Sequence, residues 1–286
     1  MTPAKLVAPL VALGLFVASP ALAKTKARDA WKQVLKGCAE NDLLGKDLLY
    51  FGPSNNLGVG SVLRKRQNGY GVRYRTSDLN IPSGVKFLNE GTLAKCSGYS
   101  RRTFTLGGGA NLENPIAPLN GEVSALLNRG RNVTIGVTHY RWDTLVEGPF
   151  ESWFKNSADA SVKDDLYAPA ASGHDPRYVV IKALWISGFT AEVTFDSRVG
   201  ADVKGKIPPG PVEASNLGFN AMVKWEGNEK LMIESIEPFF IVGEIAEFAP
   251  AGGIRGNVRP PLAKVSFKFE KVSNVQNDSV ALKNPQ

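Results

Sequence analysis

The sequence predicts an α+β fold that is mostly β, with twisted antiparallel sheets in a sandwich-like arrangement, an N-terminal covering helix and one or two short helices. Two stretches that alternate apolar and polar residues, 189–196 and 217–226, indicate the clearest strands. Successive side chains of a strand point to opposite faces, so each stretch has one apolar and one hydrophilic face. Gly227 and Asn228 favour a tight turn into a return strand that begins at Leu231.

The remaining secondary structure follows from periodicity and turn residues. Residues 24–41 predict an amphipathic helix, because Trp31, Val34, Leu35 and Cys38 recur at spacings of three or four between basic residues. Short helices are expected near 121–129 and after Pro149. Further strands are expected at 48–51, 57–63, 70–75, 103–106, 133–140, 239–242 and 265–269.

One stretch of the chain divides the predicted elements into two halves. Residues 157–177 are rich in Ala, Ser and Asp and lack sustained periodicity, which indicates a linker or long loop. The chain is therefore expected to have an N-terminal α+β half at 24–156 and a C-terminal β-rich half at 178–273. Residues 274–286 are polar and are expected to form a flexible tail.

The N-terminus has the pattern of a cleaved secretory signal peptide, residues 1–23. Lys5 supplies the positive start, 6–18 form a short apolar run, and Ala21-Leu22-Ala23 is a small-x-small cleavage site. Cleavage near Ala23 would leave Lys24 at the mature N-terminus and place the protein in the periplasm or outside the cell. No later run approaches the roughly 20 apolar residues of a membrane-spanning helix.

The predicted export determines the redox environment of the two cysteines of the chain. Cys38 and Cys96 are an even pair, and in an oxidising compartment such a pair is expected to form a disulfide. Closing a loop of this length stabilises the fold by roughly 4 kcal/mol in the chain-entropy model. The alternative is a pair of buried free thiols.

Basic residues gather on one predicted hairpin. Asn68-Gly69 favours a tight turn between a strand carrying Arg64, Lys65 and Arg66 and a strand carrying Arg73 and Arg75. These five side chains are the candidate anion-binding residues. The alternative is an ordinary exposed sheet face.

The charge of the chain narrows the choice of partners. The formal net charge is +7, and residues 1–23 contribute only Lys5, which leaves about +6 after cleavage. A positive charge suits anionic lipid, glycan or wall polymer as partners outside the cytoplasm. Nucleic acid is not expected there. Improved solubility is the alternative meaning of the charge.

The sequence offers no catalytic motif. Its two histidines are His139, which is expected to be structural, and His174, which is expected to be exposed. HExxH, GxSxG and metal-ligand spacings are absent, so no cofactor, metal or catalytic residue is predicted. A hydrolase that uses two carboxylates stays open, because the fold alone would bring them together.

Three functional hypotheses follow, of which the first leads. The protein is an exported, non-catalytic binding or envelope-associated module that recognises anionic surfaces or ligands. Alternatively it is a membrane-active protein, similar in behaviour to pore-forming proteins, whose amphipathic hairpins rearrange into lipid. The third hypothesis is the carboxylate-based hydrolase.

Overall fold

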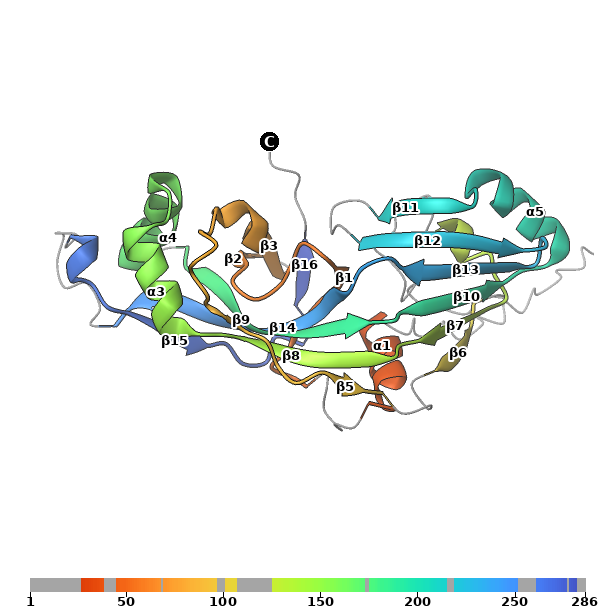
Figure 1. The fold of residues 1–286 in the computed structure, drawn as a ribbon, viewed down its shortest axis with the longest axis horizontal. Helices are drawn as coiled ribbons and strands as arrows, with labels where there is room; N and C mark the ends of the chain where they lie inside the picture. Colours follow the sequence, from red (N-terminus) through yellow and green to blue (C-terminus); the bar gives the residue numbers. More distant parts are fainter. Residues whose placement is uncertain are drawn as a thin grey trace, which may run out of the picture.

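The computed structural model describes residues 27–38, 45–67, 69–96, 101–106, 125–172, 175–214, 219–251, 261–276 and 278–281. The signal peptide predicted at 1–23, the turn residue Asn68 and His174 lie outside these ranges. The predicted fold class is confirmed: the molecule is mostly β, with antiparallel sheets and a few helices (Figure 1).

Strands make up most of the described chain. Up to residue 145 they are β1 (Leu49–Ser54), β2 (Val62–Arg66), β3 (Gly69–Tyr74), β4 (Leu88–Asn89), β5 (Ala94–Lys95), β6 (Arg102–Thr105), β7 (Asn132–Gly136) and β8 (His139–Leu145). Later strands are β9 (Arg177–Ser187), β10 (Thr190–Thr194), β11 (Gly210–Ala214), β12 (Phe219–Glu226), β13 (Lys230–Ser235), β14 (Phe239–Pro250), β15 (Phe267–Lys271) and β16 (Ser279–Ala281).

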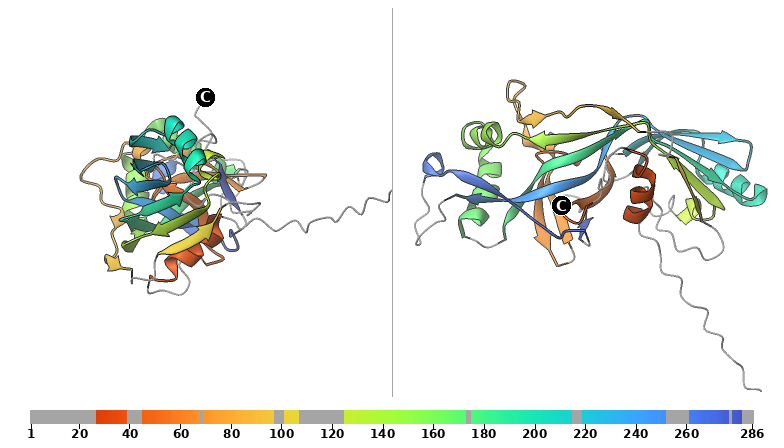
Figure 2. Two further views of the ribbon diagram at one scale, coloured as in Figure 1. Left: turned by 90° about the vertical axis from the view of Figure 1, so that its right-hand side faces the viewer. Right: turned by 90° about the horizontal axis from the view of Figure 1, so that it is seen from below.

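Helices lie at the edges and ends of the sheets (Figures 1 and 2). They are α1 (Ala27–Leu35), the 3-10 turn η1 (Thr76–Leu79), α3 (Glu147–Asn156), α4 (Ala160–Ser172), α5 (Ser197–Lys206) and the 3-10 turn η3 (Leu262–Lys264). As expected from its spacing, α1 buries Trp31, Val34 and Leu35.

The strands form two sheets. A ten-stranded sheet has the order β15-β14-β1-β16-β3-β2-β9-β8-β4, with β5 also paired to β8. A six-stranded sheet has the order β11-β12-β13-β10-β7-β6. Both sheets combine strands from residues 24–156 and 178–273, so the two halves of the sequence share their cores.

Two strand pairs run from one sheet into the other. Gly136 pairs with Thr190 in the six-stranded sheet, and His139 pairs with Ser187 in the ten-stranded sheet, so the register is the same on both sides of the junction. In the same way, β10 pairs with β13 in one sheet and β9 pairs with β14 in the other, with a small shift in register between them. Three long strand paths therefore cross the molecule, at 132–145, 177–194 and 230–250 (Figure 1).

Within the larger sheet, six strands close into a ring. β14 pairs with both β1 and β9, and the path continues from β1 through β16, β3 and β2 back to β9. β16 lies parallel to both of its neighbours, whereas the other strand pairs of the described residues are antiparallel. The side chains of Leu49, Leu63, Tyr70 and Ile245 belong to one buried apolar cluster at this ring.

The buried disulfide attaches α1 to the edge of the larger sheet. Cys38, just after α1, is bonded to Cys96, just after β5, which confirms the predicted pair. Trp31 packs against Phe189 and Phe239, whose ring centroids lie 5.8 and 6.1 Å from that of Trp31. Helix α1 thus covers the place where the two sheets meet.

Two predicted loop regions contain regular structure instead. Helix α4 occupies most of the expected linker at 157–177, where Val162, Leu166 and Tyr167 bury an apolar side that the Ala- and Ser-rich composition conceals. Residues 279–281 of the expected tail form β16. Residues 282–286 lie outside the described ranges.

Candidate functional site

The predicted basic residues do lie on one hairpin, formed by β2 and β3. Arg64 pairs across the hairpin with Gly71, Lys65 with Tyr70, and Arg66 with Gly69. Arg64, Lys65, Arg66 and Arg73 are exposed, and Arg75, just past the end of β3, is half-buried.

Carboxylates from three other segments neutralise three of these cations. Arg64 contacts Asp175 at 2.8 Å, Lys65 contacts Asp278 at 2.8 Å, and Arg73 contacts Asp165 at 2.7 Å. The buried Arg177 joins the same network, at 3.1 Å from both Asp165 and Asp175. Most of the positive charge that the sequence places on the hairpin is therefore balanced within the fold.

The network also changes the acidity of its carboxyl groups. Burial alone would raise the pKa of Asp165, but hydrogen bonds from Arg73 and Arg177 outweigh it and hold the pKa below its usual range. The pKa of Asp175 is lowered in the same way, with burial opposed by Arg177 and Arg64. Both carboxylates are charged at neutral pH.

Arg66 and Arg75 form no ion pair within the described part of the chain. The Arg66 guanidinium packs across the hairpin, so close that a Cβ at Gly71 would lie 2.2 Å from its Nε. The backbone N–H of Arg75 donates to Asp78 at 2.9 Å. An anion-binding role for the hairpin stays a prediction, and it would depend chiefly on these two side chains.

The six-stranded sheet has one continuous apolar face. Apolar residues pair with apolar residues across its strands: Val133 pairs with Val193, and Val193 pairs with Leu231. The buried side chains of this face are Val133, Ile135, Ala191, Val193, Phe219, Ala221, Val223, Leu231 and Ile233. The alternation that predicts strands at 189–196 and 217–226 is the origin of this face.

The opposite face of the same sheet is hydrophilic and carries balanced charges. Glu192 contacts Arg101 at 3.3 Å and Lys230 at 3.1 Å. Lys224 contacts Glu234 at 2.6 Å. Pairs as exposed as these contribute little to stability, so they mainly keep the face wettable without net charge.

Separate elements cover the apolar face. α1 contributes Trp31, Val34 and Leu35, and α5 with the residue after it contributes Val203 and Ile207. α5 is held to the β12–β13 hairpin by polar contacts: Trp225 Nε1 donates to the Ile207 carbonyl at 2.9 Å, and Lys204 Nζ donates to the Gly227 carbonyl at 3.0 Å. Among the described residues, the short helices α1 and α5 thus supply much of this cover.

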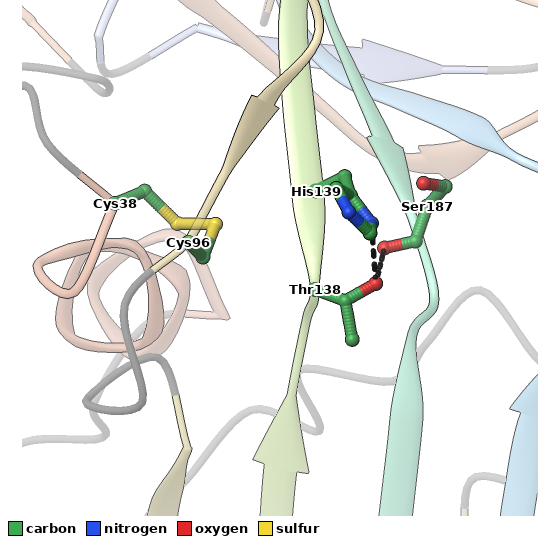
Figure 3. The surroundings of a disulfide bond; sticks show 5 residues. All are labelled: Cys38, Cys96, Thr138, His139 and Ser187. Atoms are coloured by element: carbon green, nitrogen blue, oxygen red, sulfur yellow. Dashed lines mark hydrogen bonds between the residues drawn. A yellow bond between two sulfur atoms is a disulfide. The ribbon is translucent and has the colours of Figure 1, made fainter.

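The junction between the sheets contains His139 (Figure 3). Its Nδ1 lies 2.9 Å from the Thr138 hydroxyl, which also lies 3.2 Å from the Ser187 carbonyl. Gly188 follows with a φ of 63°, and a Cβ there would lie 1.9 Å from Thr138 Oγ1. The expected structural role of His139 fits this packing at a strand bend.

Four carboxylates in the C-terminal strands form ion pairs on the described sheet surface. Besides Glu192 and Glu234, Glu226 contacts Lys230 at 3.2 Å, and Glu244 contacts Lys271 at 2.9 Å. Each of these groups thus has a cationic partner on the sheet surface, which is the arrangement of solvated ion pairs. This geometry gives the hydrolase hypothesis no support.

Comparison with known proteins identifies no family. No family model matches the chain, and no curated protein matches it. Among solved structures, a bacterial gasdermin from Bradyrhizobium tropiciagri is similar, at 10% identity and a TM-score of 0.43. The match covers 90% of this chain and 99% of the gasdermin chain. With so low an identity and TM-score, the similarity by itself says nothing about function.

Within the described ranges, no helix is long and apolar enough to cross a membrane. Nor does any group of three or more His, Cys, Asp or Glu side chains there suit a metal ion.

Sequence reasoning missed the carboxylates that neutralise the hairpin and the continuity of the strands. Asp165 and Asp175 lie 92 and 111 positions from their partners on the hairpin, so no local pattern could pair them with it. The continuity had a visible signal, because the strand expected at 133–140 runs across the junction, where Val137 and Thr138 separate β7 from β8.

Proposed function

We propose that the protein acts on lipid bilayers after export, and that its six-stranded sheet is the part that enters lipid. The observation that carries this proposal is the continuous apolar face of that sheet beneath short, separate helices. Strands that cross membranes alternate lipid-facing apolar residues with water-facing polar residues, as β7, β10, β12 and β13 do.

Two further features support the proposal. The backbone groups inside the sheet are already hydrogen-bonded across strands, as a bilayer interior requires. A strand needs roughly 9–11 residues to cross a bilayer. β10 and β13 are shorter, but the strand paths at 177–194 and 230–250 exceed this length because they continue into the larger sheet.

The leading alternative from the sequence is a module that binds anionic surfaces without entering them. The ion pairs of Arg64, Lys65 and Arg73 weaken this alternative, because a ligand would have to compete with carboxylates already in place. The membrane-active hypothesis needs no displacement of these carboxylates, since lipid would replace the apolar contacts of α1 and α5.

The test uses the mature chain from Lys24 with dye-filled vesicles of anionic or neutral lipid, at low and high salt. Sedimentation measures binding, and dye release measures disruption of the bilayer. We expect binding and release together. Binding without release, abolished by salt, would contradict the proposal and favour the surface-binding module.

Trp225 reports whether the sheet itself enters lipid. It lies on the apolar side, next to Phe195 and the Ile207 carbonyl. Vesicles with brominated acyl chains should quench tryptophan fluorescence in the native chain, and Trp225→Phe should remove part of that quenching. If both proteins release dye and show the same quenching, lipid contacts a part of the protein other than the surroundings of Trp225.

A further inference from the structure

A cavity of about 440 Å³ lies beside η1 and β4, at the edge of the ten-stranded sheet. Its apolar lining comes from Val59, Ile81, Val85, Phe87 and Leu88. This volume and lining are in the range of pockets that bind small apolar ligands. The residues that line the cavity lie outside the six-stranded sheet.

The floor of the cavity is fixed by aromatic packing. The Phe87 ring lies edge-on to Phe150 with centroids 5.2 Å apart, and 5.9 Å from Trp153. The Thr76 hydroxyl, which also lines the cavity, donates to the Val59 carbonyl at 2.9 Å. Its hydrogen bond is therefore already satisfied, which leaves the interior suited to a hydrocarbon group.

The rim of the cavity carries charges of both signs. Glu90 at the rim contacts Arg141 at 2.9 Å, and Arg141 also contacts the buried Asp143 at 2.9 Å. Lys86, also at the rim, is exposed and forms no ion pair in the described part of the chain. An occupant with an apolar body and an anionic end would match this arrangement.

Exposed apolar side chains lie on and beside the segment that lines the cavity. Leu88 is 42% exposed, Leu93 53% and Val146 40%, although large hydrophobic residues are usually covered. Residues 85–95, which we call the edge strap, run along β8, where Leu88 pairs with Leu145, and the Val146 N–H donates to the Phe87 carbonyl. A second unpaired lysine, Lys95, lies on the same strap among the described residues.

Apolar side chains combined with unpaired lysines are the composition of a surface that binds the headgroup region of an anionic bilayer. We propose that the edge strap docks the protein on a bilayer that contains anionic lipid, with one acyl chain entering the cavity and the anionic headgroup at Lys86. This proposal rests on the membrane-active function above, for which it supplies the first contact with lipid.

Vesicle sedimentation tests the docking surface. The proteins are the mature chain, Lys86→Gln and Leu88→Asn, with phosphatidylglycerol–phosphatidylcholine vesicles. Removing one lysine near such a surface should weaken binding about fivefold. Losing one inserted leucine should weaken it roughly tenfold. Lys264→Gln is the control, because it alters an unpaired lysine elsewhere in the described structure.

A soluble ligand tests the cavity separately. Decyl phosphate, below its critical micelle concentration, carries one aliphatic chain and an anionic end. We expect saturable binding to the native chain by calorimetry. Val85→Trp should abolish that binding by filling the cavity, and Ile236→Trp should not. Circular dichroism and urea unfolding check that each variant is folded.

The outcomes separate this inference from the function on which it rests. Dye release that is unchanged in both strap variants would overturn the docking surface and leave the membrane-active function standing. Binding to vesicles that requires the strap, without release, would support docking and contradict membrane activity. Decyl phosphate binding without vesicle binding would indicate a site for free single-chain lipids and overturn docking. A protein that binds neither vesicles nor decyl phosphate would also overturn docking by the edge strap.

Discussion

At the scale of single residues, Gly188 determines how the strands pass from one sheet to the other. Its φ of 63° is unfavourable for residues with a Cβ, and the Thr138 hydroxyl occupies the position where a Cβ would lie. The strand paths can bend here without breaking their register because this position has no side chain.

Gly188→Ala should lower the free energy of unfolding by about 2–3 kcal/mol, from backbone strain and the contact with Thr138 together. Gly227→Ala is the matched control: its φ is also 63°, and a Cβ there meets nothing within 4 Å. It should cost only about 1 kcal/mol. Equal losses in urea unfolding would show that the close approach to Thr138 is unimportant.

Asp165 and Asp175 make stability depend on pH in a defined direction. Their pKa values are lower in the folded protein than in the unfolded chain, where an Asp titrates near about 3.9. Their contribution is therefore complete above that pKa and is lost as pH falls through the lower folded values.

Asp165→Asn should lose about 1–3 kcal/mol at pH 7, because the buried Arg177 loses a charged partner. It should also show a smaller fall in stability than the native chain as pH drops below about 5, measured by urea unfolding. Asp202→Asn removes the partner of Arg129 on an exposed pair and should change little. A native-like pH profile in Asp165→Asn would contradict this assignment.

At the scale of elements, the disulfide fixes the end of α1 on the sheet edge. Cys38 and Cys96 are separated by 58 positions, and both are buried. Replacing both by Ser should lower the free energy of unfolding by about 4 kcal/mol, measured by urea unfolding. The reduced native protein is the control and should show a similar loss. If neither differs from the oxidised protein, the bond does not restrain the unfolded chain as expected.

The elements also show what a sequence can predict. β10 and β12 are predictable because each has one buried face, so burial alternates along the chain. The cysteine pair is predictable from its number and from the signal pattern. Helix α5 is not predictable, because its buried residues are Gly200 and Val203 alone and two such residues produce no apolar periodicity. The cavity is not predictable either, since its lining comes from segments that only the fold brings together.

At the scale of the whole molecule, the unchanged register makes the two sheets one hydrogen-bonded unit. Amides at 132–145 and 177–194 should therefore exchange with solvent together, in an opening near the global unfolding free energy. α5, which only covers one face, should exchange earlier. Hydrogen exchange followed by mass spectrometry measures whether these amides exchange together. Earlier exchange confined to 132–136 would mean that the two sheets open separately at the junction.

The ring of six strands has a consequence for the order of events during biogenesis. β16 is the last of these strands in the chain, yet it lies between β1 and β3, which are among the first. Chains emerge from the ribosome N-terminus first, so β1 and β3 lack their shared neighbour β16 until residue 281 has been made. Until then each has an open edge, and such edges are sites of aggregation. A chain that is exported before it folds would meet this risk on the far side of the membrane.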